Sequence, residues 1–454
     1  MEFYSSRRKP VNRFRTVVVA GVLLSGWGVL GWGQGSGAAV GAPTGGAGAP
    51  VKLGIADAEA IAMKNHPQIS TARLLALAEG QVAREAEASE LPTLTGNLTA
   101  VQAHDGGRIT AGVLNNPVLY TRAAGGVSVS QLITDFGRTR NLVQSAALNG
   151  RAQQSNELAT EADIKLAVDE AFYRALAAQA VVDVAKKTVA FRQDTSNLVG
   201  SLANAKLKST LDQSFAEVNL NQAQVLLLDA QNAQDAAFAD LSNVLGYEQQ
   251  QNFVLVDASA QPAPPGDDIN ALTTMAFNSR PDLAALNEQQ EAAEKYRKAE
   301  HELWLPTISA LGVAGGSPVR SDAITSNWYG AAGVNISVPI LNGGLYSARA
   351  KEADYRANAA QEQVRGLRNA IARDVRVSWL SAQSAYQKIG VTAKLLAQAN
   401  QALDLAQTRY KLGLSSIVEL SQAQLAQTSA EIGNTNARYD YERALAMIRY
   451  QTGQ

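Results

Sequence analysis

The feature that most constrains this chain is an internal duplication. Two long helical hairpins, from Asp135 to about Gly246 and from Asn342 to Gly453, superpose in sequence at a constant shift of 207 residues. In the first helix of each hairpin, apolar or small residues recur at alternating steps of four and three, the spacing of a coiled-coil seam. The seam positions are Ile164, Val168, Ala171, Ala175, Ala178, Val182, Ala185 and Val189 in the first copy, and Ile371, Val375, Ser378, Ala382, Ala385, Ile389, Thr392 and Leu396 in the second.

The ascending segments, residues 138–206 and 344–412, are each 69 residues long and contain no proline. At about 1.5 Å per residue, each helix reaches roughly 100 Å, which is several times the width of an ordinary domain. The sequence therefore predicts a rod or a tube of packed helices.

The amino-acid composition limits which metal and catalytic sites the chain can contain. Charged residues make up 18% of the chain and cysteine is absent, which excludes disulfides and Cys-based metal sites. The three histidines, His66, His104 and His301, do not pair at metal-ligand spacing, and no nucleophile elbow, carboxylate pair or phosphate loop stands out. We therefore expect no catalytic site, no metal and no cofactor, and no basic face points to nucleic acid.

The N-terminus has the pattern of an export signal. Residues 1–33 combine a basic stretch with an apolar run, and small residues suited to peptidase cleavage follow within 33–42. A single membrane anchor is the alternative, although the apolar run is short for a span. Residues 34–52 are rich in glycine and alanine and are predicted to be disordered.

Each copy of the duplication extends beyond its hairpin. The first repeat is assigned to residues 53–248 and the second to 268–454, joined by a linker at 249–267. Each repeat begins with a helix broken by a proline, 55–90 at Pro67 and 271–302 at Pro281. A strand pair then precedes each long hairpin, at 91–103 and 123–134 in the first repeat and at 305–316 and 328–341 in the second.

Polar and weakly apolar residues alternate along these strands, as Thr93, Leu94 and Thr95 illustrate. Segments of about ten residues with this period suit an outer membrane barrel, with lipid on one face and a wet lumen on the other; a soluble hairpin resting on a helix is the alternative. Four strands per chain are too few to close a barrel, and lipid forbids an open sheet edge, so several chains have to contribute. The aromatic residues near the strand ends, where girdles occur, are Trp304, Trp328, Tyr329 and Tyr120.

The chain resembles the TolC family of outer membrane factors over about residues 53–453. The resemblance rests on the element order, occurring twice, and on local motifs: Leu91-Pro92-Thr93 with Leu305-Pro306-Thr307, Asp135-Phe136-Gly137-Arg138 with Asn342-Gly343-Gly344, and the turn from Tyr410 to Leu420. It implies a mainly α fold with a membrane β-barrel portion. Three chains would supply four strands each to a 12-stranded barrel, which continues into a long α-helical coiled-coil barrel in the periplasm.

The resemblance also implies the function. Such proteins are passive exit ducts in the outer membrane, coupled through a periplasmic adaptor protein to an inner-membrane efflux pump or an ABC exporter for type I secretion. The alternative is a soluble periplasmic coiled-coil protein of structural or adaptor type. An adaptor, however, would carry one hairpin flanked by compact β domains. The cargo, whether drugs, metals or a secreted protein, is not encoded in a recognisable motif.

Two sets of site residues follow from the resemblance. The adaptor-docking tip maps to Leu412, Gly413, Leu414 and Ser415, with Leu207, Ser209 and Thr210 in the first copy, where Lys206 replaces the glycine. A plain helix–helix turn also accounts for these residues. The pore constriction maps to Glu419 and Gln422, with Asp212 from the first copy. Three copies of Glu419 around an axis predict a weakly cation-selective aperture; first-turn carboxylates on solvated helix faces are the alternative.

Overall fold

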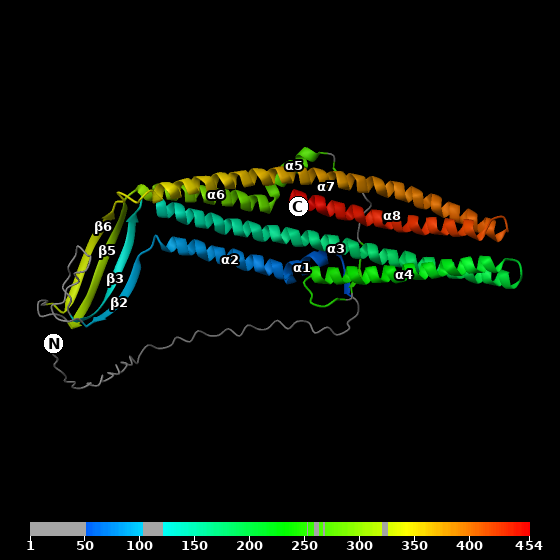
Figure 1. Cartoon of the computed structure of the whole chain (residues 1–454), viewed down its shortest axis with the longest axis horizontal. Helices are drawn as coiled ribbons and strands as arrows, with labels where there is room; N and C mark the ends of the chain where they lie inside the picture. The colour runs from blue at the N-terminus through cyan, green and yellow to red at the C-terminus, as the bar shows by residue number, and fades with distance from the viewer. Residues whose placement is uncertain (1–50, 103–120, 252, 258–262, 267, 320–325) are drawn as a thin grey trace, which may run out of the picture. The chain divides into compact units, whose positions relative to one another are not determined.

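The computed structural model describes residues 51–102, 121–251, 253–257, 263–266, 268–319 and 326–454, all within one unit, Pro50–Gln454 (Figure 1). The predicted signal peptide, residues 34–50 of the predicted disordered segment, His104 and Tyr120 lie outside the described residues. The elements follow the duplication, because a helix pair, a strand pair and a long hairpin occur twice in the same order.

Each repeat opens with two helices that meet at a proline. The first repeat has α1 (Ile55–Asn65) and α2 (Pro67–Ala88), and the second has α5 (Ile269–Ser279), α6 (Pro281–His301) and the short 3-10 helix η1 (Glu302–Trp304). Proline is tolerated at the first position of a helix because its missing N–H would have no intrahelical partner there. At the first break, the Nδ1 atom of His66 accepts a hydrogen bond from the Gln68 amide at 3.3 Å. The predicted breaks are therefore the starts of new helices.

The long hairpins consist of α3 (Arg138–Asn204) with α4 (Thr210–Val244), and α7 (Leu345–Lys411) with α8 (Ile417–Thr452). Every position of the two predicted seams is buried or half-buried, which confirms the coiled-coil spacing. On α4, the buried alanines recur every seven residues, at Ala216, Ala223, Ala230 and Ala237. Small side chains at this period allow the helices to pack closely along their length.

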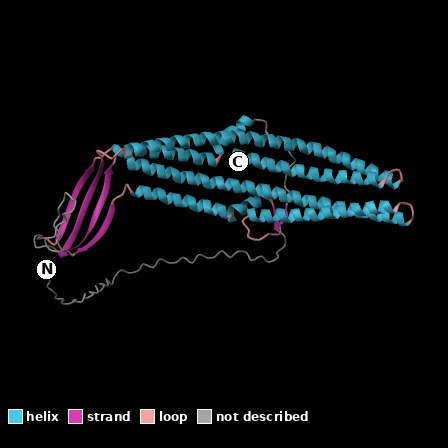
Figure 2. Cartoon of the chain, viewed as in Figure 1, coloured by secondary structure: helices cyan, strands magenta, loops and turns pink. Residues whose placement is uncertain are grey.

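The helices pack side by side, as Figure 2 shows. Helix α3 contacts α2, α4, α6 and α8, and α7 contacts α6 and α8. The largest hydrophobic core lies around the middle of α3, where Phe172 and Leu176 meet Leu241 and Leu245 of the α4 end and Leu53 ahead of α1. Among the described residues, no helix combines the length and the apolar character that a bilayer crossing needs.

The four strands of the two repeats form one antiparallel sheet in the order β2-β3-β5-β6. Their bounds are β2 (Thr93–Val101), β3 (Arg122–Thr134), β5 (Thr307–Val319) and β6 (Trp328–Ser337). The β3–β5 pairing joins the two repeats, and β2 and β6 are the sheet edges. All four strands consequently belong to a single surface rather than to two separate hairpins.

The register places like side chains on the same face of this sheet. Thr95 pairs with Ser128, which pairs with Val313, and Asn97 pairs with Gly126. The neighbouring positions on the other face are Leu94, paired with Val129, and Val334, paired with Ala310. Because directly opposite residues of an antiparallel pair share a face, one face is richer in hydroxyl and amide groups, and the other is largely apolar but also holds Gln131, which pairs with Ala310. The alternation is thus regular along β2 but interrupted at Gln131 in β3 and at Leu311 and Val313 in β5.

Two details of the strand prediction were wrong. Strand β6 ends at Ser337 rather than continuing to 341, because Pro339 has no N–H to donate and β5 starts opposite Ser337, at Thr307. In addition, Trp328 and Tyr329 are consecutive in β6 and therefore point to opposite faces, with Tyr329 beside Gly126 and Gly315 on the polar face. Of these two residues, it is Trp328 that lies on the apolar face, where a girdle residue would have to be.

The repeat boundaries also contain a small parallel sheet that the sequence did not predict. Strand β1 (Val51–Leu53) pairs with β4 (Phe253–Leu255), so the last two residues of the predicted disordered segment and part of the predicted linker are ordered strands. Leu53 and Leu255 are buried in the core around α3. The strands are three residues long, too short to show a two-residue period in the sequence.

Candidate functional site

The turn between α3 and α4 closes the first hairpin. Its backbone amides bond back to the helix: Lys206 N donates to Ala203 O at 2.9 Å and Leu207 N donates to Leu202 O at 2.9 Å. This 5→2 and 6→1 pattern is a Schellman motif, which satisfies the last carbonyls of the helix. Ser209 then caps α4, since its hydroxyl accepts from Asp212 N at 3.1 Å while Asp212 Oδ2 accepts from Ser209 N at 3.3 Å.

The turn between α7 and α8 has the same backbone pattern. Gly413 N donates to Tyr410 O at 3.1 Å and Leu414 N donates to Arg409 O at 2.8 Å. The cap of α8 is Ser416, whose hydroxyl accepts from Glu419 N at 3.3 Å. Ser416, and not the neighbouring Ser415, therefore occupies the capping position.

Lys206 and Gly413 adopt the same left-handed conformation, with φ angles of 62° and 76°. Glycine reaches this region without steric cost, whereas lysine does so against its Cβ. The first copy therefore has lysine instead of glycine at this position, but the backbone conformation is the same. The two turns therefore share their backbone conformation but differ in side chains, with Lys206 and Lys208 in the first where Gly413 and Ser415 stand in the second.

Contacts between the turns join the two hairpins. The Lys208 ammonium lies 4.4 Å from the centroid of the Tyr410 ring, a cation–π distance. Tyr410 is 2% exposed and packs in a cluster with Val199, Ile417 and Leu420. Burial and the nearby Asp212 raise the pKa of Tyr410 above its ordinary value, so the phenol stays neutral. Ser209, Tyr410 and Ser416 therefore belong to one packed end of the helices.

The predicted docking residues differ in exposure. Leu207, Leu412 and Leu414 are about two-thirds or more exposed, and Ser209, Thr210 and Gly413 are also exposed. Ser415 is half-buried, and its hydroxyl oxygen has no hydrogen-bond partner among the described residues. The turns thus present three large apolar side chains to their surroundings.

The predicted constriction residues begin the two descending helices at equivalent positions. Asp212 and Glu419 are related by the 207-residue shift, but their contacts differ. Asp212 completes the capping box of α4, whereas Glu419 Oε1 lies 3.1 Å from Arg409 Nε of the preceding helix. Gln422 is exposed one turn further along α8. The sequence reading missed Arg409, although it lies ten residues before Glu419, across the turn.

A layer of polar residues lies between the hairpins, a few helical turns away from the turns that close them. Asn219 Nδ2 donates to Ser421 Oγ at 2.6 Å, and Gln424 Nε2 donates to Thr195 Oγ1 at 3.4 Å. Arg192 is 6% exposed, and burial lowers its pKa from the ordinary value. These contacts fix the register of α3 and α4 against α8 through hydrogen bonds as well as packing.

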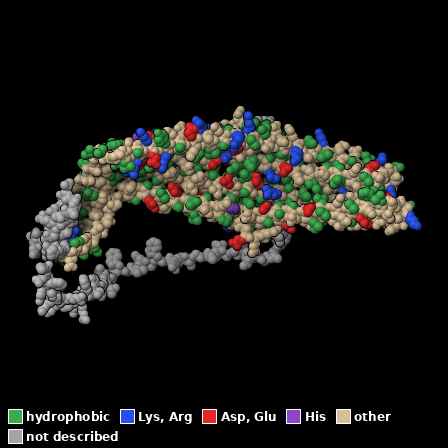
Figure 3. Space-filling model, viewed as in Figure 1, with side chains coloured by type: hydrophobic (Ala, Val, Ile, Leu, Met, Phe, Trp, Pro, Cys, Tyr) green, Lys and Arg blue, Asp and Glu red, His purple; other side chains and the backbone are tan. Residues whose placement is uncertain are grey.

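Elsewhere the surface carries charges of both signs. On the face shown in Figure 3, Lys and Arg side chains are interspersed with Asp and Glu over the helices. Within the described ranges, no group of three or more His, Cys, Asp and Glu residues is arranged to hold a metal ion.

Comparison with known proteins identifies the family to which this architecture belongs. The sequence profile of the outer membrane efflux protein family matches residues 60–247 and 272–454, one match for each repeat. The chain belongs to the outer membrane efflux protein family. It is therefore an outer membrane exit duct of efflux or type I secretion systems that extends into the periplasm.

Individual relatives of this family are distant in sequence. The chain is 25% identical to the alkaline protease secretion protein AprF of Pseudomonas aeruginosa, covering 88% of this chain and 84% of AprF. Its alignment with TolC of Salmonella enteritidis is 24% identical but spans only 41% of this chain and 40% of TolC. The fold matches the outer membrane protein VceC of Vibrio cholerae with a TM-score of 0.74 at 18% identity, over 88% of this chain and 96% of VceC.

Several sequence expectations are thereby confirmed: the TolC-like fold with its membrane β-barrel portion, the exit-duct function and the outer membrane location. Members of the outer membrane efflux protein family are channels rather than enzymes. They work with periplasmic adaptors and inner-membrane pumps, and TolC-like channels are trimers.

Proposed function

We propose that three copies of this chain form a passive conduit, to which a periplasmic adaptor couples an inner-membrane efflux pump or ABC exporter. No catalytic step and no cofactor form part of the proposal. The observation that carries it is the four-stranded sheet, which has a largely apolar face and, among the described residues, two unpaired edges.

The edges require other chains. Every residue of β2 and of β6 is exposed, and each strand pairs on one side only. In lipid, each unpaired backbone group would cost several kcal/mol, so an open sheet cannot stay there. Pairing β2 of one copy with β6 of the next closes the surface without any new element. Three copies then give the 12 strands that the family resemblance implies.

The turns are the proposed docking element for the adaptor. The exposed residues Leu207, Leu412 and Leu414 form apolar points on a backbone that two Schellman motifs hold rigid. Ser209, Thr210, Gly413 and Ser415 complete the predicted tip. Apolar side chains on a rigid frame suit binding because little conformational entropy is lost on contact.

The start of α8 is the proposed constriction. In a trimer, Glu419 and Gln422 would each occur three times around the axis, with Asp212 at the equivalent place on α4. The Arg409 guanidinium beside Glu419 balances much of its charge. This pairing supports an aperture that is only weakly cation-selective.

Two measurements test the proposal. Light scattering of the purified full chain in detergent should give three times the protomer mass, and planar bilayers should show discrete conductance steps. A monomer that conducts no ions would overturn the conduit. For docking, Leu414→Asp should abolish co-purification with an adaptor co-expressed from the same genome. Leu395→Asp, at another leucine that is more than half exposed within α7, is the matched control that should retain it.

A further inference from the structure

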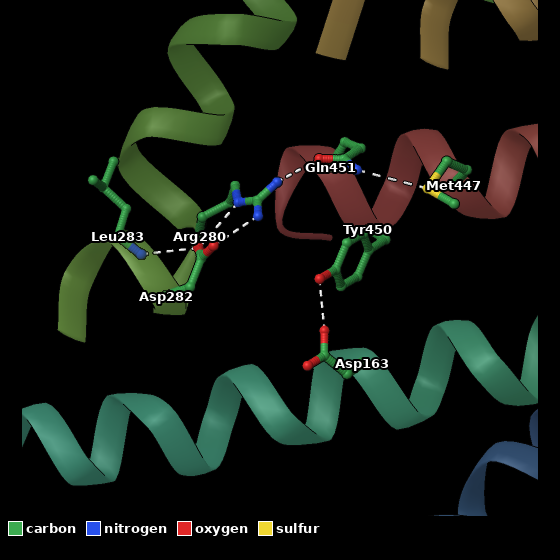
Figure 4. A network of polar contacts seen from close by, with 7 residues as sticks. All are labelled: Asp163, Arg280, Asp282, Leu283, Met447, Tyr450 and Gln451. Atoms are coloured by element: carbon green, nitrogen blue, oxygen red, sulfur yellow. Dashed lines mark hydrogen bonds and ion pairs between the residues drawn. The ribbon is translucent and has the colours of Figure 1, made fainter. Parts of the chain in front are cut away.

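The helices of the two long hairpins form a row in which α4 and α7 are the outer members. Helix α3 lies between α4 and α8, and α8 lies between α3 and α7 (Figure 1). Hydrogen bonds join the two inner helices: Gln424 donates to Thr195 at 3.4 Å, and the Tyr450 hydroxyl donates to Asp163 Oδ1 at 2.6 Å, as Figure 4 shows for the second pair. The 207-residue shift relates α3 to α7 and α4 to α8, so the α3–α8 interface has a counterpart between α7 and an α4 helix.

Two hollows on the helices are equivalent under the same shift. A cavity of about 540 Å³ lies between α3, α4 and α8, and a groove of about 480 Å³ runs along α7 beside Asp440 of α8. The α3 residues that line the cavity are Tyr173, Arg174, Ala177, Ala178 and Val181, and the residues 207 positions later, Leu380, Ser381, Ser384, Ala385 and Lys388, line the groove. The groove is therefore the cavity of the other repeat with one wall missing.

The missing wall corresponds to a surface of α4. In the cavity, that wall is formed by four residues of α8: Asn436, Tyr439, Asp440 and Arg443. Their equivalents in α4 are all exposed: Asp229, Asn232, Ala233 and Ala236. The floor of the groove is also uncovered, because Leu380 is 52% exposed where its equivalent, Tyr173, is 7% exposed. Both halves of a second α3–α8-like interface are thus present on one chain, at opposite edges of the row.

The charges of the two surfaces are complementary. Helix α4 contains five Asp or Glu residues and no Lys or Arg. The part of α7 that this fit sets against α4, residues 375–409, contains four Lys or Arg residues and one acid, Asp404. Opposite charges on facing surfaces favour association and fix its register.

One pair of charges meets in this fit. Lys388 Nζ lies 3.5 Å from Asp440 Oδ2 at the edge of the groove. Asp229 has no cationic partner within the described part of the chain. The equivalents of Lys388 and Asp229, which are Val181 and Asn436, line the same cavity. Asp229 of a second copy would therefore lie beside Lys388.

We propose that α4 of a second copy of this chain covers the α7 groove in the register that α8 has on α3. Lys388 then lies between Asp440 of its own chain and Asp229 of the neighbouring copy, and Leu380 becomes buried. This interface rests on the proposed assembly of three copies and extends it from the sheet edges β2 and β6 to the helices. A helix of an adaptor protein is the other candidate occupant of the groove, and the test distinguishes the two.

The test is cross-linking between introduced cysteines, for which the chain has no cysteine background. Two matched double variants are made: Asp229→Cys with Lys388→Cys, and Glu217→Cys with Ala402→Cys, the equivalents of Gln424 and Thr195. The crossed variants, Asp229→Cys with Ala402→Cys and Glu217→Cys with Lys388→Cys, use the same positions but lie roughly 20 Å out of register. With a short bis-maleimide and the purified full chain in detergent, the matched variants should give covalent dimers and trimers on denaturing gels, and the crossed variants should not.

Charge reversal tests the ionic contact separately. Asp229→Lys and Lys388→Asp should each raise the protein concentration at half-assembly about tenfold, because the change is repeated at three interfaces, and their combination should restore assembly. Both positions are exposed, so the variants are expected to fold. Unchanged assembly of the single variants would overturn the contact between Lys388 and Asp229.

Light scattering before cross-linking separates this interface from the proposed assembly. A monomer would overturn both. A trimer whose matched variants do not cross-link, or whose crossed variants cross-link equally well, would leave the assembly standing and overturn the α4–α7 interface. The α7 groove would then be open to an adaptor helix.

Discussion

Arg409 Nε lies 3.1 Å from Oε1 of Glu419, so an ion pair spans the turn between α7 and α8. Both side chains are about half exposed, and such pairs contribute less than about 1 kcal/mol to stability. The pair therefore matters more for the local charge of the proposed aperture than for folding. In the equivalent turn, Asp212 has a backbone amide as its partner instead.

Single-channel selectivity tests this pairing. Arg409→Gln leaves Glu419 unbalanced and is expected to shift the reversal potential in a salt gradient toward cation selectivity. Glu419→Gln should shift it toward anions, and the double variant should return close to the original value. Arg365→Gln, which removes the arginine of an exposed pair with Glu362 elsewhere on α7, is the control without effect. Identical reversal potentials for the unmodified chain, the two single variants and the double variant would show that the start of α8 does not line the aperture.

Lys206 provides a test of backbone strain. Its φ of 62° costs a non-glycine residue roughly 1 kcal/mol or more, so Lys206→Gly should slow local opening of the first turn. A net gain of about 1 kcal/mol corresponds to about fivefold slower amide exchange at the turn amides that follow residue 206. Gly413→Lys is the reciprocal change and should speed exchange in the second turn. Unaltered exchange in both variants would contradict the strain argued from φ.

The sequence predicted those features that repeat with a fixed period or occur at a turn. The seam of α3 and α7 is visible because Ile164 and its successors recur every three or four residues, and the strand alternation is equally regular. It did not predict contacts between the two hairpins, such as Lys208 with Tyr410. A shift of 207 residues relates the copies in sequence, but lateral packing decides which side chains of one copy meet those of the other.

The same reason explains the long-range polar contacts that the sequence did not predict. Asp163 and Asp169 belong to α3, Arg280 to the α5–α6 junction and Arg449 and Tyr450 to the end of α8, so more than a hundred positions separate each group from the next. Strands β1 and β4 are likewise far apart and only three residues long. Periodicity within one segment carries no information about contacts between segments that are far apart in the sequence.

Asp169 gives the chain a specific pH dependence. Burial raises its pKa from 3.8 to about 6, Glu59 adds to the rise, and Arg449 opposes it. The folded state then holds the proton more tightly than the unfolded chain, so stability falls as the pH rises from about 4 through 6. Between pH 5 and 7.5 this one group is expected to lower the free energy of unfolding by roughly 1 kcal/mol.

Urea unfolding of the helical signal at both pH values checks this expectation. The loss of unfolding free energy between pH 5 and 7.5 should be smaller in Asp169→Asn than in the unmodified chain, by roughly 1 kcal/mol, because asparagine does not titrate. The charged groups facing Asp169 are Glu59 and Arg449, with Tyr173 on the same helix, and they remain in both proteins. An equal pH dependence of the two proteins would show that protonation of Asp169 does not cause the change in stability.

Gly126 is expected to be indispensable to the sheet. It is paired with Gly315 in β5, and a Cβ added at residue 126 would lie 2.7 Å from the Ala314 carbonyl oxygen and also meet the Tyr329 hydroxyl. Gly126→Ala therefore forces β3, β5 and the Tyr329 ring apart, at a cost of about 1 to 3 kcal/mol typical of overpacking.

Gly96→Ala is the matched control in β2, where no atom lies within 4 Å of the added Cβ. Heat-resistant oligomer on gels and the yield in outer membrane fractions should fall for Gly126→Ala and stay unchanged for Gly96→Ala. Equal losses in both variants would mean that glycine content, rather than the close approach of Tyr329 and β5, limits assembly.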